Sequence, residues 1–126
     1  MGAHDMPVSY RIDHERRVVL ARADGRVAPE DFSEFLDALA GDAGFDPEID
    51  LLFDLRGISG DWPPTSVVRH FVEHPIFAGS ARKAYVASGD LTFGLVRMFE
   101  MMRADPAGNI RAFRDMDEAR AWLGLD

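Results

Sequence analysis

The sequence predicts an α/β domain built on a mostly parallel sheet. The main observation is the run EIDLLFDLRG at 48–57, in which both alternating faces are apolar from Leu51 to Phe53. A strand covered on both faces has this pattern, and such strands lie centrally in parallel sheets. A second observation is that strand patterns alternate along the chain with helical periodicity, which is typical of parallel strands joined by helices. The predicted order is β-β-α-β-α-β-α-β-α, which means five strands, the first of them antiparallel, and four helices.

The first third of the chain predicts a β-hairpin followed by a helix. Residues 8–12 alternate between apolar and polar, which indicates a half-buried strand, and residues 17–23 return as a second strand after a polar turn. Pro29 suits the first position of a helix, and apolar residues then recur at i, i+3, i+4 and i+7 until Gly41. The residues of this apolar stripe are Phe32, Phe35, Leu36 and Leu39.

The part of the chain after the central strand predicts two more strands and three more helices. Helix ends are indicated by proline, by glycine and by capping aspartates, and strands by short apolar runs. The parallel strands are expected to follow one another in sequence order across the sheet. The predicted elements are a helix from Pro64 or Thr65 to Pro75, a strand at 83–87, a helix capped by Asp90, a strand at 110–113, and a helix that follows Asp115 and ends at Gly124.

Length, charge and composition limit the classes of function. The chain has 126 residues, a formal net charge of -8 and no cysteine. One domain over residues 1–126 is expected. The acidic balance argues against nucleic acid and anionic membranes as partners, and the lack of cysteine excludes disulfides and thiolate ligands. No apolar run reaches the length of a membrane span, and the N-terminus lacks the features of a secretory signal, so a cytoplasmic protein is expected.

Several short motifs form an ordered set that covers nearly the whole chain. They are YRID at 10–13, PEDF at 29–32, LFDL at 52–55, KAYV at 83–86, RAF at 111–113 and EARAWL at 118–123. This set resembles the SpoIIAA-like family, which is related to STAS domains. The resemblance implies a protein that is not an enzyme, and STAS domains bind protein partners or small ligands. Relatives with this fold are proposed to hold apolar molecules.

A phosphoswitch is one alternative that this resemblance suggests. STAS phosphoswitch proteins carry an Asp-Ser pair followed by Gly at the N-terminus of the helix after the central strand. The matching stretch here is GDWPPTS at 60–66, which lacks that motif. Thr65 and Ser66, with Ser59 nearby, are the candidate phosphosites, because a phosphate at a helix N-terminus gains from backbone amides and the helix dipole. Because the motif is missing, we expect no phosphorylation.

A small hydrolase is the other alternative. The segment HFVEH at 70–74 matches the HxxEH pattern of inverted zinc proteases, in which two histidines share one helix face. His70, Glu73 and His74 fall on the outward stripe of the predicted helix, and Pro75 ends that helix at once. We therefore expect no bound metal and no cofactor, and favour adventitious surface binding of metal over catalysis.

Three aspartates follow strands that are expected to lie close together. Asp54 ends the central strand, Asp61 lies in the loop after it, and Asp90 follows the strand at 83–87. Clustered carboxylates at the carboxyl ends of parallel strands can bind Mg²⁺ or raise the pKa of one member. The interpretation that we favour is that Asp61 and Asp90 are independent loop and capping residues, while Asp54 is structural or part of a site.

Five apolar side chains are the candidate ligand-binding residues. Trp62 lies on a loop restrained by two prolines, and Phe93 lies away from the inner stripe of its predicted helix. The methionines of that helix offer adaptable packing beneath them. We therefore predict a non-catalytic binding or regulatory module that holds a small apolar, lipid-like ligand or a protein partner, with a homodimer as one form of the latter. The candidate residues are Trp62, Phe77, Phe93, Met98 and Met101.

Overall fold

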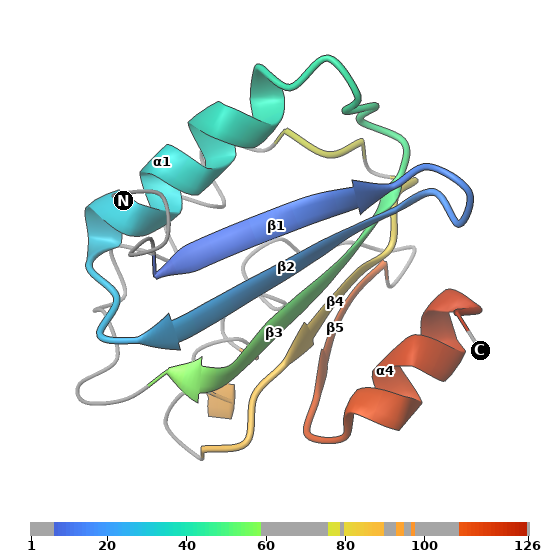
Figure 1. The fold of residues 1–126 in the computed structure, drawn as a ribbon. Coiled ribbons are helices and arrows are strands. Elements are labelled where there is room, and N and C mark those ends of the chain that lie inside the picture. The colour runs from blue at the N-terminus through green and yellow to red at the C-terminus, as the bar shows by residue number, and fades with distance from the viewer. Residues whose placement is uncertain are drawn as a thin grey trace.

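The computed structural model describes residues 7–58, 76–78, 80–89, 93–94, 97 and 109–125, and it shows an α/β fold (Figure 1). Its strands and helices fall where the sequence patterns predict them, within one or two residues at each end. They are β1 (Val8–Asp13), β2 (Val18–Gly25), α1 (Pro29–Ala40), β3 (Asp50–Ile58), β4 (Lys83–Val86), β5 (Ile110–Phe113) and α4 (Met116–Leu123).

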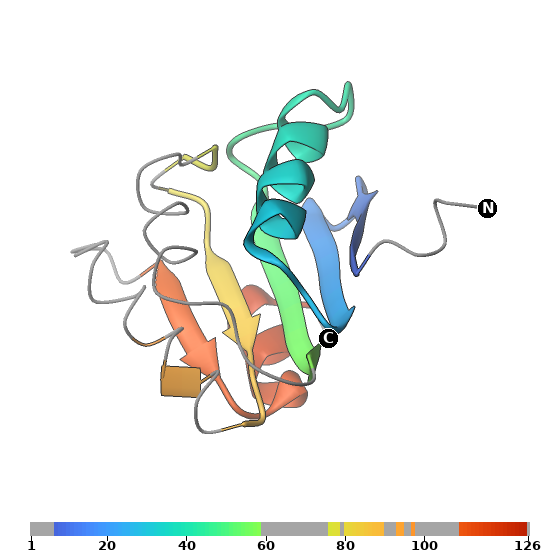
Figure 2. The same ribbon diagram turned by 90° about the vertical axis from the view of Figure 1, so that its left-hand side faces the viewer.

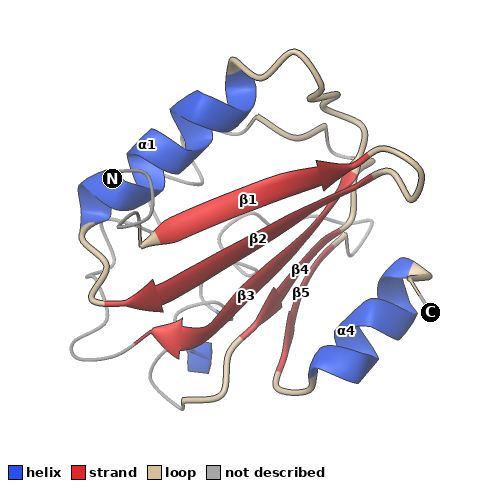
Figure 3. Ribbon diagram, in the orientation of Figure 1, coloured by secondary structure: helices blue, strands red, loops and turns tan. Residues whose placement is uncertain are grey.

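The strands form one five-stranded sheet in the order β1-β2-β3-β4-β5. β1 pairs with β2 in the antiparallel direction, and every later neighbour pairs in parallel (Figure 3). The mixed sheet, its antiparallel first strand and the sequential order of the parallel strands are therefore confirmed. β3 lies at the centre, as its doubly apolar pattern predicts.

Two of the four predicted helices, α1 and α4, are confirmed. The other two, from Pro64 or Thr65 to Pro75 and after Asp90, fall mostly outside the described residues. Within the third predicted helix, Phe93 and Gly94 have helical conformation, and the Phe93 amide donates a hydrogen bond of 2.8 Å to the Gly89 carbonyl.

The helices α1 and α4 lie on opposite faces of the sheet (Figure 2). Because side chains alternate along a strand, β3 sends Leu51 and Phe53 to the α1 face and Leu52 and Asp54 to the α4 face. This alternation divides the buried residues into two clusters, a larger one under α1 and a smaller one under α4.

The larger cluster is centred on Phe53, whose side chain is 1% exposed. Its ring meets Phe35 edge-on at 5.2 Å between centroids, and it stacks on Tyr85 of β4 at 6.0 Å. Phe32 lies 6.2 Å away on the same helix as Phe35. Aromatic pairs at these distances stabilise beyond the area that they bury, so Phe53 joins α1 to the middle of the sheet.

Local signals explain the ends of the two helices. The Ala28 amide donates to the Asp31 carboxylate at 2.7 Å at the start of α1. The Asp115 carboxylate accepts a hydrogen bond of 2.9 Å from the Asp117 amide at the start of α4, as its capping role predicts. Gly124 ends α4 with a φ of 75°, a left-handed conformation that glycine adopts without strain.

The β2–β3 pairing contains an irregularity between Arg22 and Asp24, which brings Asp24 opposite Gly57. A Cβ atom on Gly57 would overlap the Asp24 carboxylate and would lie 3.2 Å from the Ala23 carbonyl oxygen. The Asp24 carboxylate is also held in place by Arg22, at 2.8 Å from its Nε. A side chain at position 57 would therefore have to displace the Asp24 carboxylate from Arg22 and crowd the Ala23 carbonyl oxygen.

We predict that Gly57→Ala lowers the free energy of unfolding by about 1–3 kcal/mol, the usual cost of overpacking a tight site. Denaturant unfolding measures it. Gly41→Ala is the matched control, because its nearest neighbour would lie at an ordinary 3.5 Å. In an Asp24→Ala background the cost of Gly57→Ala should shrink, and an undiminished cost would contradict this explanation.

Candidate binding surface

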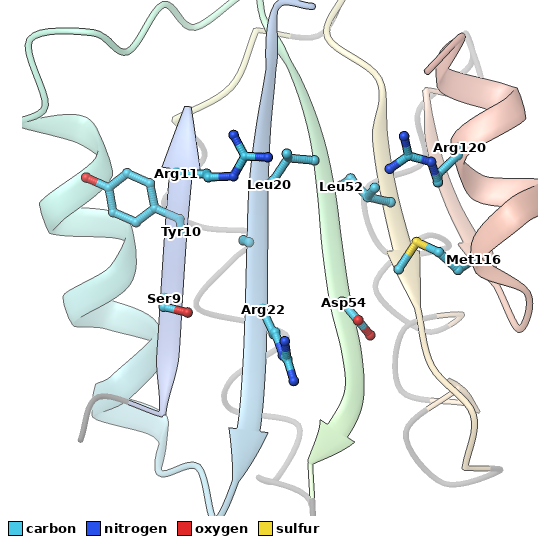
Figure 4. A pocket seen from close by; sticks show the side chains of 10 residues that line it. Ser9, Tyr10, Arg11, Leu20, Arg22, Leu52, Asp54, Met116 and Arg120 are labelled. Carbon is cyan, nitrogen blue, oxygen red and sulfur yellow. The ribbon is translucent and has the colours of Figure 1, made fainter. Parts of the chain in front are cut away.

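The α4 face of the sheet is only partly covered by the residues that the structure describes. α4 contacts β3, β4 and β5. Beside it, Ser9 and Arg11 of β1 and Arg22 of β2 are exposed, so the strip over these two strands is open. A groove of about 410 Å³ lies along this strip, and we call it the arginine groove (Figure 4). Its lining residues are Ser9, Tyr10, Arg11, Leu20, Ala21, Arg22, Leu52, Asp54, Met116 and Arg120.

The register of the strands builds the floor of the groove in two rows. Arg11 pairs with Leu20, and Leu20 pairs with Leu52, so these three side chains lie side by side across the sheet. One pleat further along the strands, towards the carboxyl ends of β2 and β3, Ser9, Arg22 and Asp54 form the second row in the same way. The first row is apolar at its centre, and the second row is polar.

The edge of α4 forms one wall of the groove. Met116 and Arg120 are four residues apart, so they lie on the same side of the helix and both reach the groove. Figure 4 shows Arg11 extending from β1 towards Leu20, while Arg120 extends from α4 towards Leu52. The two guanidinium groups therefore flank an apolar centre made by Leu20 and Leu52.

The groove carries a positive charge in a protein whose net charge is -8. Its lining holds three arginines and one aspartate. Arg11 is exposed and has no ion pair with any residue in the described part of the chain. Arg22 pairs with Asp24 at 2.8 Å, and Arg120 donates to the Leu125 carbonyl at 3.1 Å. All three keep donors available, because a guanidinium has five N–H groups.

Asp54 is half-buried in the groove and bound to Arg56. The Arg56 side chain donates to both Asp54 carboxylate oxygens, at 2.9 and 3.0 Å, and the Arg56 amide donates at 3.0 Å. Desolvation by burial acts to raise the pKa of Asp54, but these hydrogen bonds and the charges of Arg56 and Arg22 outweigh it and lower the pKa. A carboxylate with a lowered pKa stays ionised at neutral pH, so Asp54 is not poised as a general acid.

Most of the predicted site residues lie outside the described residues, and those predictions stay predictions. They include the aspartates that would join Asp54, the tryptophan and methionines of the apolar site, the phosphosites and the HxxEH segment. In the described part of the chain, no group of histidine and acidic side chains could hold a metal ion. The residues outside it are Ser59, Asp61, Trp62, Thr65, Ser66, His70, Glu73, His74, Asp90, Met98 and Met101.

The structure describes two of the candidate ligand-binding residues and does not bring them together. Phe77 precedes β4 and meets Phe45 edge-on at 5.3 Å. Phe93 follows β4, at the other end of that strand, and the Arg114 guanidinium lies 4.2 Å from the centre of its ring. Both rings are half-buried against the core under α1. The proposed ligand site at Phe77 and Phe93 stays a prediction.

The sequence patterns did not predict Arg11, Arg22 and Arg120 as binding residues. Arg11 alternates with the apolar residues of β1, and Arg22 lies between Ala21 and Ala23 of β2. The period of two alone could have assigned both arginines to one face of the hairpin. It could not have shown that Arg120 on α4, a hundred residues later, lies beside the same strip.

Known proteins resemble this chain in sequence and in fold. The family model described as SpoIIAA-like matches residues 18–124. The chain belongs to the SpoIIAA-like family. A comparison with curated protein sequences gives no significant match. No helix in the described part of this SpoIIAA-like protein has the length and apolar character needed to cross a bilayer.

Two solved structures share the fold of this SpoIIAA-like protein. One is an uncharacterised protein with a SpoIIAA-like fold from Shewanella loihica, with 22% sequence identity and a TM-score of 0.59 over 92% of this chain and 93% of that chain. The other is an anti-sigma factor antagonist from Mycobacterium paratuberculosis, with 14% identity and a TM-score of 0.60 over 95% of this chain and 97% of that chain. At these identities the likeness establishes the fold.

We predict that Asp54 makes stability depend on pH in the acid range. Because its pKa is lowered in the folded protein, its contribution is full above the ordinary value of 3.8 and is lost as the pH falls through the lower folded value. Asp54→Asn should therefore be less stable than the wild type at neutral pH, and the gap should close on acidification. Chemical unfolding over a pH series measures this gap. Glu15→Gln, in the exposed turn between β1 and β2, is the matched control, and a gap for Asp54→Asn that does not vary with pH would contradict the assignment.

Proposed function

We propose that this SpoIIAA-like protein is a non-catalytic regulatory module that acts by binding a protein partner. The observation that carries the proposal is the arginine groove, an open strip of sheet with an apolar centre and a positively charged rim. Protein interfaces typically combine an apolar centre with a polar rim, and arginine is enriched in them. The similarity in fold to an anti-sigma factor antagonist, a protein named for its action in regulation, supports the same class of function.

The shape of the groove favours a macromolecule over a buried small substrate. Small-molecule sites are usually concave and cover most of the ligand surface. Here the rim residues Ser9, Arg11 and Arg22 are exposed, and Leu20 is only half-buried. Such a surface gains binding energy only when a partner with its own apolar patch covers a larger area.

The partner hypothesis predicts a stoichiometric complex. The tagged protein is captured from its native cells, the captured proteins are identified, and each is purified and mixed with the purified chain. We expect one of them to form a complex of defined mass, measured by size-exclusion chromatography with light scattering. If none does so from purified components, the proposed function is wrong.

The STAS-type phosphoswitch is kept as a variant of this proposal. If it operates, a phosphate at Thr65 or Ser66 should prevent the complex, because two negative charges and three acceptor oxygens would be added at one place. Peptide mapping of protein isolated from its native cells would detect that phosphate.

A small apolar ligand near Phe93 is the second candidate function. It is favoured by the half-buried Phe93 ring at the carboxyl end of β4, and by the sequence pattern at Trp62, Met98 and Met101. Each buried CH₂ group would add about 0.8 kcal/mol of binding free energy.

In Trp122→Phe protein, where Trp62 is the only tryptophan, saturable quenching should strengthen along a series of fatty acids and weaken in Phe93→Ala. Gly94→Ala, at a neighbouring position with open space around it, is the control for helix perturbation. A response that does not vary with chain length would remove this candidate.

A further inference from the structure

We propose that the arginine groove binds an amphipathic helix of a partner protein, with acidic residues on both sides of the apolar stripe of that helix. This inference rests on the proposed function and names both the surface and the chemistry of the partner. It is carried by the width of the uncovered strip, by the order of apolar and charged residues across it, and by the charge of the whole protein.

The uncovered strip is one helix wide. Neighbouring strands lie about 4.8 Å apart, and an α-helix with its side chains is about 10 Å across. α4 packs on β3 to β5, and the groove beside it, with exposed side chains on β1 and β2, leaves room for one more helix. Two helices that pack together on a sheet lie about 8–10 Å apart, which would place Met116 of α4 at their contact.

The pattern across the strip matches one amphipathic helix. The half-buried Leu20 and Met116 supply the apolar surface that a partner can reach, beside Leu52, which is only 4% exposed. A helix with apolar residues at i, i+3, i+4 and i+7 would cover this centre with one stripe. The groups on either side of the stripe would then face Arg11 on the outer strand and Arg120 on α4.

The positive charges of the arginine groove favour acidic residues on both sides of the apolar stripe of the bound helix. Carboxylates can form two parallel hydrogen bonds to a guanidinium, and such pairs are stronger than neutral ones. Arg22, in the neighbouring polar row, already pairs with Asp24 at 2.8 Å, and Asp54 binds Arg56. A basic helix would be repelled at Arg11 and Arg120, so the same residues that recruit an acidic partner exclude a basic one.

A second copy of this chain is a weaker occupant of the groove. Two copies docked face to face about a two-fold axis would bring arginines against arginines, because such an interface uses the same patch on both subunits. Head-to-tail docking on the exposed acidic side of α1, where Glu30 and Glu34 lie, would give a ring or an open chain of subunits instead of a two-fold dimer.

The test uses two synthetic peptides of about 18 residues, which form about five helical turns. In the acidic peptide, glutamates flank a leucine stripe on both sides, and in the basic peptide lysines replace the glutamates. We expect the labelled acidic peptide to bind the full chain saturably, measured by fluorescence anisotropy, and the basic peptide not to bind. Raised salt should weaken binding, because the rim charges are exposed.

Arg11→Glu should weaken binding of the acidic peptide by at least about tenfold, because it reverses a rim charge. Arg16→Glu is the matched control, because Arg16 carries the same charge change in the exposed turn, outside the groove. Amide chemical shifts should move along β1, β2 and the Met116–Arg120 side of α4. Equal affinity of wild type and Arg11→Glu would overturn the proposal, as would equal binding of both peptides.

Two further outcomes would also overturn the proposal that a helix occupies the groove. If decanoate shifts the groove amides and the acidic peptide does not, the occupant is a small anionic amphiphile. If the unliganded chain forms concentration-dependent oligomers that Arg11→Glu disperses, the occupant is a second copy.

The experiments distinguish a failure of the proposed binding surface from a failure of the proposed function. A purified partner that binds Arg11→Glu as tightly as wild type would overturn this surface and leave the proposed function standing. Binding of the acidic peptide at the groove, with no protein partner found in native cells, would support the surface and overturn the function.

Discussion

The burial of β3 on both faces is the constraint on which the rest of this structure depends. On one face Phe53 packs against α1 and Tyr85, and on the other Leu52 belongs to the cluster under α4. A strand buried on both sides needs a neighbour on each edge and a helix on each face, because its backbone groups and both sets of side chains must leave water. The sheet order and the opposite placement of α1 and α4 satisfy these needs.

The same alternation that buries β3 also creates the binding surface. When Leu52 faces α4, Asp54 must face the same side two residues later, and the parallel pairing with β2 brings Leu20 and Arg22 beside them. The antiparallel β1 then adds Arg11 to the row of Leu20. A charged rim around an apolar centre therefore follows directly from the register of three strands.

The charge of the arginine groove is opposite in sign to the net charge of the protein. The chain is acidic overall, yet one face holds three arginines within a single groove. Local fields of this kind guide the approach of a partner and fix its orientation, more than they add to its affinity. Asp54 and Arg56 neutralise each other at one end of the groove. Arg11, on the outer strand, has no ion pair among the described residues.

The sequence by itself determined the strands and the two described helices, because periods of 2 and 3.6 and the capping residues are local signals. The sequential order of the strands was expected only from the resemblance to the SpoIIAA-like family. The sequence pattern also put Asp54 at the end of the buried strand, whereas Asp54 lies in the middle of β3. Only the tertiary structure decided that Arg120 meets Arg11 across one groove. The physical reason is that α4 packs over β3, β4 and β5 and stops short of β2. How far a helix extends across a sheet depends on packing between segments a hundred residues apart, which no local pattern records.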